Sequence, residues 1–185
     1  MYNKKVVAIT GKIGSGKSEV AKYLKQQGYV VFNCDEIARS MFFVQDVKNE
    51  IVSLLGQESY CNEDLNVQYV REKVFANEDL LQSYNKIFHP RVKVQLEYLL
   101  SSSNEKIVFV EIPLLSAFEF DWTQIWVVET DFENVAKRTQ KRNNPQLETI
   151  FNKQDSYQGI SICNNGSIAD LQNQIANLLI ELKQS

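Results

Sequence analysis

The amino-acid sequence predicts an α/β protein built on a five-stranded parallel sheet, and three observations lead to this prediction. Short apolar runs alternate with segments of helical periodicity, which is the pattern of βαβ units. The runs are continuous instead of alternating with polar residues, as expected for parallel strands buried on both faces. A glycine-rich turn follows the first run and opens directly into a helix. The five predicted strands are residues 6–10, 29–32, 107–110, 125–128 and 160–163.

The glycine-rich turn has the sequence GKIGSGKS and is followed by a helix that we expect to end near Gln27. It matches G-x-x-x-x-G-K-[ST] at every defined position. Its backbone N–H groups would lie at the positive end of the helix dipole, where a polyphosphate binds. Lys17 would reach the β- and γ-phosphates, and the Ser18 hydroxyl would complete a Mg²⁺ shell. An ordinary glycine-rich turn is the alternative. The predicted nucleotide-binding positions of this loop are Gly11, Lys12, Ile13, Gly14, Ser15, Gly16, Lys17 and Ser18.

A helical block separates the second and third predicted strands. From Glu36 to about Ser103 no convincing strand is found, and apolar residues recur at helical spacing. We expect Gly56, Cys61-Asn62 and Pro90 to divide the block into helices. The predicted domains are therefore a nucleotide-binding core of residues 1–35 and 104–185, and a helical subdomain of residues 36–103 inserted in it. By analogy with other nucleotide-dependent enzymes, the insertion would bind the second substrate.

Acidic residues follow three of the predicted strands. Asp35, Glu111 and Asp131 could each serve Mg²⁺ or act as a general base. Asp35 is the better candidate for activating an acceptor hydroxyl, because it lies next to the helical insertion.

Cations gather on a helix that we predict from about Glu133 to Arg142. Lys137, Arg138, Lys141 and Arg142 lie on neighbouring turns, where guanidinium groups could bind phosphate oxygens. A solvated cationic face or a nucleic-acid patch is the alternative, and we favour phosphate binding for Arg138 and Arg142. The last helix begins with Ser167 and Asp170 at the spacing of a capping box.

Two further signals are weaker. His89 is the only histidine, so sites built on several histidines are excluded. It precedes Pro90 and could begin a helix, with substrate contact as the alternative.

Residues 152–155 read N-K-x-D, a guanine-reading pattern of GTPases. They lie in a polar stretch instead of following a buried strand, so we reject that interpretation.

Composition narrows the class of protein. The 185 residues suit one domain with an inserted subdomain, and the net charge of −3 disfavours general binding to nucleic acid or membrane surfaces. Cys34, Cys61 and Cys163 form no C-x-x-C pair, which disfavours a zinc site or a disulfide framework. The N-terminal residues read as a strand instead of a signal peptide, so we expect a cytoplasmic protein. We expect a monomer or a weak homo-oligomer.

Several segments in order along the chain resemble dephospho-coenzyme A kinase, and the resemblance covers nearly the whole sequence. The phosphate loop alone indicates only an NTPase, whereas the ordered set is far more specific. The matching segments are ITGKIGSGKSEVA at residues 9–21, DEIAR at 35–39, Val74-Phe75, HPRV at 89–92, Pro113-Leu114-Leu115, Arg138 with Arg142, Gln154, and ICNNGS at 162–167.

This resemblance implies the three-layer fold of P-loop NTPases with an acceptor-binding insertion and a lid at about residues 138–158. It also implies a phosphotransferase that uses ATP and Mg²⁺ to phosphorylate the ribose 3′-hydroxyl of dephospho-coenzyme A. Arg138 and Arg142 would hold the transferring phosphoryl group, and Asn164 would lie near the adenine. Asn33, Arg39 and His89 would belong to the acceptor side.

The sequence also departs from the family pattern. The family usually has D-x-D after the second strand, and its first aspartate is regarded as the general base. Asn33 stands at this position and cannot accept a proton, so Asp35 would take over through a water molecule. Val67 replaces a usual arginine and Ala117 a usual glutamate. If the site is otherwise competent, Asn33→Asp should raise turnover. Another small-molecule kinase and a non-catalytic sensor of ATP or coenzyme A remain alternatives.

Overall fold

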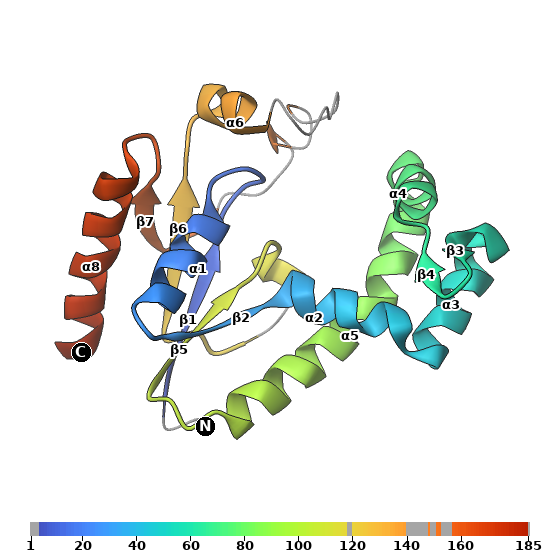
Figure 1. Ribbon diagram of the computed structural model, residues 1–185, viewed down its shortest axis with the longest axis horizontal. Coiled ribbons are helices and arrows are strands. Elements are labelled where there is room, and N and C mark those ends of the chain that lie inside the picture. The colour runs from blue at the N-terminus through green and yellow to red at the C-terminus, as the bar shows by residue number, and fades with distance from the viewer. Residues whose placement is uncertain (1–3, 118–119, 140–147, 149–150, 153–156, 185) are drawn as a thin grey trace. The chain divides into compact units, whose positions relative to one another are not determined.

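Five parallel strands form one sheet in the order β2-β5-β1-β6-β7, which confirms the predicted α/β class (Figure 1). The structure is a computed structural model that describes residues 4–117, 120–139, 148, 151–152 and 157–184. The strands are β1 (Lys5–Thr10), β2 (Val30–Asn33), β5 (Ile107–Glu111), β6 (Gln124–Glu129) and β7 (Ile160–Cys163). All five lie within two residues of their predicted bounds.

The register of the sheet brings the carboxyl ends of its strands to one edge. Asn33 at the end of β2 pairs with Glu111 at the end of β5, and Thr10 at the end of β1 pairs with Val127. In open parallel sheets ligands bind at this edge. The loop of residues 11–16 begins there, directly after β1.

Helices of this part of the chain bury one apolar stripe each. Helix α1 (Lys17–Gln26) buries Val20, Ala21 and Leu24, and α8 (Ile168–Gln184) buries residues spaced by three or four. Both stripes join strand residues in one core cluster. Helix α6 (Phe132–Thr139) follows β6, and the short helix η3 (Leu115–Ala117) follows β5. The buried stripe of α8 consists of Leu171, Ile175, Leu179 and Leu182.

The capping box predicted before α8 is present. The Ser167 backbone N–H donates to Asp170 Oδ2 over 2.9 Å, and the Asp170 backbone N–H donates to Ser167 Oγ over 3.2 Å. Each residue satisfies a donor of the other, which fixes where the helix begins. Ile168, the first residue of α8, is exposed.

Residues 34–103 form a second compact unit, and the sheet with its helices forms the first, made of Met1–Asn33 and Asn104–Ser185. The elements of the second unit are mostly helical. They are α2 (Cys34–Ser40), η1 (Met41–Phe43), α3 (Gln45–Leu55), η2 (Gln57–Ser59), β3 (Tyr60–Cys61), β4 (Asp64–Leu65), α4 (Val67–Ala76) and α5 (Glu78–Ser102).

Two local predictions for this block are wrong. No strand was expected, but β3 and β4 pair as a small antiparallel hairpin in which Cys61 pairs with Asp64. Its turn contains Asn62 at φ 58°, a left-handed conformation that asparagine tolerates better than most residues. Two-residue strands carry too little apolar alternation to be recognised in a sequence.

Pro90 does not separate two helices, because it lies inside the 25-residue helix α5. His89 therefore lies within a helix, and the interpretation that it begins one is wrong. A proline inside a helix disturbs the hydrogen bonds of the preceding turn. Here Arg91 donates from its guanidinium to the Ile87 carbonyl over 2.6 Å and also pairs with Glu50. The buried residues Phe88 and Val92 on both sides of the proline hold the helix in its unit.

Other expectations concern residues that the structure does not describe. Helix α6 is described only to Thr139, so Lys141, Arg142 and most of the predicted lid lie outside the described residues. The same holds for Gln154 and for most of the N-K-x-D segment. Among the described helices, none is both long and apolar enough to span a membrane.

Candidate active site

The loop between β1 and α1 has the backbone conformation that its glycines predict. Gly11, Gly14 and Gly16 have φ values of 144°, 73° and 102°, a region that residues with a Cβ rarely adopt. Gly16 precedes the first residue of α1 and, as a glycine, provides no side-chain cap for this helix. The first amides of a helix have no acceptor within it, so this end of α1 can bind an anion.

Two of these glycines are also required by their neighbours. A Cβ at Gly11 would lie 2.3 Å from the Val128 carbonyl oxygen of β6. A Cβ at Gly16 would lie 2.0 Å from Asn164 Nδ2. The loop is therefore packed directly against the strand beside it and against the segment after β7.

Polar groups of the loop are held close to its backbone. Lys17 Nζ donates to the carbonyl oxygens of Gly11 and Lys12 over 2.9 and 3.0 Å. The ammonium group thus lies within the loop, where phosphates would bind. The buried hydroxyls of Thr10 and Ser15 have no hydrogen-bond partner among the described residues. Each can therefore still form a hydrogen bond at the site.

Glu111 connects two residues that the sequence analysis singled out. Its Oε1 accepts a hydrogen bond from Ser18 Oγ over 2.8 Å, and its Oε2 accepts one from Asn33 Nδ2 over 2.7 Å. The Glu111 side chain is buried at the end of β5, whereas Ser18 is exposed in the first turn of α1. A carboxylate and a hydroxyl are oxygen donors of the kind that Mg²⁺ binds.

Asn164 lies under the loop. Its side chain is buried, and Nδ2 donates to the Ser15 carbonyl oxygen over 2.7 Å. Its backbone carbonyl accepts from the Arg138 guanidinium over 2.7 Å. Asn164 therefore ties the loop to β7 and α6. Sequence reasoning missed this contact, because nothing in the local pattern indicates a partner 149 residues away. The predicted contact with adenine stays a prediction.

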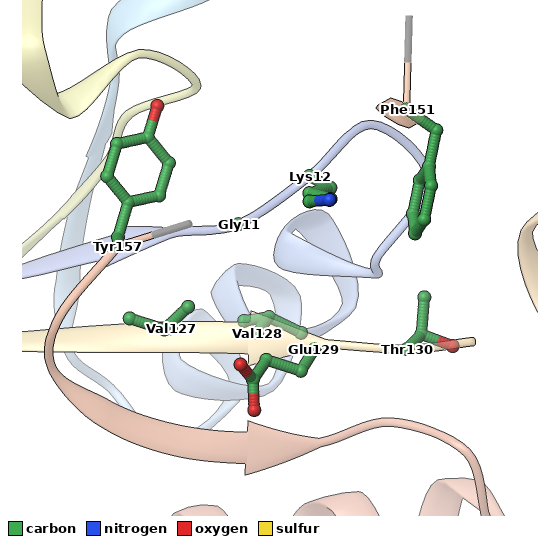
Figure 2. A pocket seen from close by; sticks show the side chains of 8 residues that line it. All are labelled: Gly11, Lys12, Val127, Val128, Glu129, Thr130, Phe151 and Tyr157. Carbon is green, nitrogen blue, oxygen red and sulfur yellow. The ribbon is translucent and has the colours of Figure 1, made fainter. Parts of the chain in front are cut away.

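A small cavity of about 160 Å³ lies beside the loop, above the end of β6 (Figure 2). Figure 2 shows Phe151 and Tyr157 at its two ends, and Lys12 Nζ lies 4.7 Å from the centroid of the Phe151 ring. At this distance the cation attracts the ring electrons. Neither aromatic residue was predicted from the sequence to be a site residue.

A larger cavity of about 730 Å³ lies within the helical unit. Its walls are mostly apolar and include Phe42, Tyr84 and Phe75. Two predicted site residues, Asp35 and Arg39, line it together with Arg71. Both predicted residues are exposed and come from α2.

His89 lies in α5 of the same unit but not among the residues that line this cavity. It is half-buried, and burial lowers the pKa of its imidazole from the ordinary 6.5. The candidate residues thus divide between the two units, and within the helical unit only Asp35 and Arg39 share the lining of one cavity. The core group is the loop with Asn33, Glu111, Arg138 and Asn164, and the helical-unit group is Asp35, Arg39 and His89.

The fold and the loop together define the class. A phosphate-binding loop after the first strand of a five-stranded parallel sheet is the architecture of P-loop NTPases. Solved kinases share this fold: the chain superposes on shikimate kinase from Acinetobacter baumannii with a TM-score of 0.57 at 16% identity, covering 98% of this chain and 96% of that one.

The particular family follows from comparison of sequences. The family model of dephospho-CoA kinase matches residues 5–169, and the chain belongs to this family. It is 31% identical to dephospho-CoA kinase of Fusobacterium nucleatum, over 90% of this chain and 92% of that protein. It is 34% identical to dephospho-CoA kinase of Staphylococcus epidermidis, over 98% of this chain and 91% of that protein. A solved protein of Thermus thermophilus superposes with a TM-score of 0.80 at 26% identity, covering 97% of this chain and 98% of that one.

Proposed function

We propose that this protein transfers the γ-phosphoryl group of ATP to the ribose 3′-hydroxyl of dephospho-coenzyme A, giving coenzyme A. The observation that carries the proposal is the match to the dephospho-CoA kinase family over residues 5–169. The loop geometry supports the donor side, and the cavity of the helical unit supports the acceptor side.

The donor side would use the loop and its first helical turn. The loop amides would bind the β- and γ-phosphates, with Lys17 turning from the Gly11 and Lys12 carbonyls to the phosphate oxygens. Arg138, now held by the Asn164 carbonyl, would add a cation beside the transferring group. Arg142 would act with it. Because phosphoryl transfer depends mainly on positioning and charge neutralisation, these cations would supply much of the rate.

The residues at the loop also fit a magnesium ion. Ser18 offers an exposed hydroxyl, and the Glu111 carboxylate lies 2.8 Å from it. No group of three or more His, Cys, Asp or Glu that could hold a metal is present in the described part of the chain. This suits Mg²⁺, which proteins bind through one or two side chains together with substrate phosphates. When bound, the ion would neutralise charge on the phosphates.

The acceptor would bind in the cavity of the helical unit. Its apolar walls suit a long uncharged arm, and the guanidinium groups of Arg39 and Arg71 suit a diphosphate. Asp35 would take the proton of the acceptor hydroxyl through a water molecule. His89 would contribute to the acceptor side from α5.

A second function is binding of ATP or coenzyme A without turnover. The observation that favours it is Asn33, which stands where the family usually has its general base and cannot accept a proton. Loss of a general base lowers a rate by about 10²–10⁴-fold, so slow turnover is also compatible with Asn33.

The test is to incubate the purified protein with Mg·ATP and dephospho-coenzyme A and to follow coenzyme A by mass spectrometry. Parallel reactions offer nucleoside monophosphates and shikimate as acceptors. Formation of coenzyme A supports the proposal, and exclusive phosphorylation of another acceptor contradicts it. Calorimetric ATP binding with no product from any acceptor would favour the sensor.

Lys17→Ala provides the variant for the donor side. We expect it to weaken ATP binding by at least about tenfold, because it removes a charge-assisted contact to phosphate. Lys22→Ala is the matched control, since Lys22 is an exposed lysine of the same helix. Equal ATP affinity in the two variants would contradict the assignment of Lys17.

A further inference from the structure

Three side chains from separate elements form a continuous chain of hydrogen bonds at the edge of the sheet. Asn33 ends β2 and is the register partner of Glu111 at the end of β5. Asn33 Nδ2 donates to Glu111 Oε2 over 2.7 Å, and Ser18 Oγ donates to Glu111 Oε1 over 2.8 Å. All three residues belong to the core unit.

The chemistry of these three side chains determines which group donates each hydrogen bond. An ionised carboxylate only accepts hydrogen bonds, so the amide must direct its NH₂ group and the serine its hydroxyl proton toward Glu111. Glu111 is only 7% exposed, and its two oxygens receive one donor from each side. With its proton directed at Glu111, the Ser18 oxygen keeps its lone pairs for a metal ion.

We propose that Asn33 is a positioning residue for the Mg²⁺ of bound ATP, acting through Glu111 on Ser18. The amide holds the Glu111 carboxylate in the orientation that receives the Ser18 hydroxyl. This inference rests on the proposed function and assigns Asn33 a task different from proton transfer. An ionised aspartate at position 33 could not donate, and it would place a second negative charge against Glu111.

The inference reverses one expectation from the sequence. Considered alone, Asn33→Asp restores a possible base and should raise turnover. With Glu111 as its neighbour at 2.7 Å, the same change replaces a hydrogen bond by repulsion between like charges. We therefore expect Asn33→Asp to weaken ATP binding in the presence of Mg²⁺ by about 10- to 100-fold, the range for losing one hydrogen bond to a charged group. Without Mg²⁺ its ATP affinity should change less than about threefold.

A reciprocal exchange provides the sharpest test. The double variant Asn33→Asp with Glu111→Gln keeps both side-chain lengths and moves the carboxylate from β5 to β2. The amide introduced on β5 could then donate to the carboxylate introduced on β2 and accept from Ser18, so the whole chain of hydrogen bonds is rebuilt. We expect the double variant to recover at least about tenfold in Mg²⁺-dependent ATP affinity over Asn33→Asp.

The measurement is calorimetric titration of ATP in excess Mg²⁺ and again in EDTA, on the unaltered protein, both single variants and the exchange. Asn173→Asp is the matched control, because it makes the same isosteric change on an exposed position of α8 in the same unit. Circular dichroism reports folding, and Asn33→Ala replaces Asn33→Asp if the latter does not fold. In steady-state assays the KM for ATP should rise and the KM for the acceptor should stay unchanged.

The outcomes separate this inference from the proposed function. It is overturned if Asn33→Asp binds Mg·ATP as tightly as the unaltered protein, if the exchange binds Mg·ATP no better than Asn33→Asp, or if the unaltered protein shows no Mg²⁺-dependent ATP binding. The expected binding pattern without coenzyme A formation would support the inference and reject the proposed function. Coenzyme A formation without that binding pattern would reject the inference and support the proposed function.

Discussion

Removing the Asn164 side chain tests whether the phosphate loop depends on a contact far away in the sequence. In Asn164→Ala the donor to the Ser15 carbonyl is lost from a buried position, and the loop is no longer tied to the segment after β7. The backbone contacts of residue 164 with Arg138 and Glu129 do not require its side chain. The change therefore removes the amide's contact with the loop, together with a longer contact of 3.4 Å from Arg138 Nη2 to Asn164 Oδ1.

The magnitude follows from the buried hydrogen bond. Losing it and leaving a buried acceptor without its partner costs about 2 kcal/mol. For a chain of this size, each kcal/mol shifts the melting temperature by about 2–4 °C, so we expect a decrease of about 4–8 °C. ATP affinity should fall by roughly tenfold, since part of the binding free energy would then be spent on ordering the loop.

Scanning calorimetry and ATP titration measure the two effects. Asn173→Ala on the exposed face of α8 is the matched control and should change neither. Asn164→Asp should be worse than Asn164→Ala at pH 8, because a carboxylate oxygen would face the Ser15 carbonyl oxygen. An unchanged melting temperature and ATP affinity in Asn164→Ala would refute the reasoning.

A coupled variant tests the same contact from the other side. Gly16→Ala would place its methyl group 2.0 Å from Asn164 Nδ2, at a φ of 102°. In the Asn164→Ala background the clash is gone and only the backbone strain remains. The destabilisation of the double variant should therefore be smaller than the sum of the two single effects. Strict additivity would mean that the two side chains do not meet.

Two further predictions concern the helical unit. Asn77 caps α5 by accepting from the amides of Asp79 and Leu80 over 2.9 and 3.1 Å, so Asn77→Ala should cost about 1 kcal/mol, measured by urea unfolding; no loss would show that the cap does not contribute. Burial lowers the pKa of His89 in the folded protein, so its contribution to stability is complete above pH 6.5 and is lost as the pH falls from 6.5 through the lower folded pKa. His89→Gln should reduce the loss of melting temperature between about pH 7.5 and 5.5, and an identical pH dependence in both proteins would contradict this assignment.

The sequence predicted most of the fold because the main elements carry local signals. The five strands are continuous apolar runs, and the loop has glycines at the positions that need positive φ. The continuity of α5 through Pro90 could not be predicted. The helix has a side-chain contact from Arg91 to the Ile87 carbonyl and buried residues on both sides of the proline, and the local sequence indicates neither.

The candidate site was predicted less completely. The loop residues, Asn33 and Asn164 could be named from motifs, but their mutual contacts could not. Glu111 was only one of three acids that follow strands, and its importance emerges from the pairing of β2 with β5. Such contacts between distant residues depend on strand order, which a single sequence does not specify.

Gly11 illustrates how one motif position can serve two tasks. Its Cα faces the Val128 carbonyl so closely that a methyl group has no room, whether or not a nucleotide is bound. We therefore expect a Gly11→Ala allele to cause a folding defect, with function retained at low growth temperature and lost at high growth temperature. Damage at Lys17 would persist at every growth temperature. Genetic screens that compare the two temperatures could thus distinguish architectural positions of the motif from chemical ones.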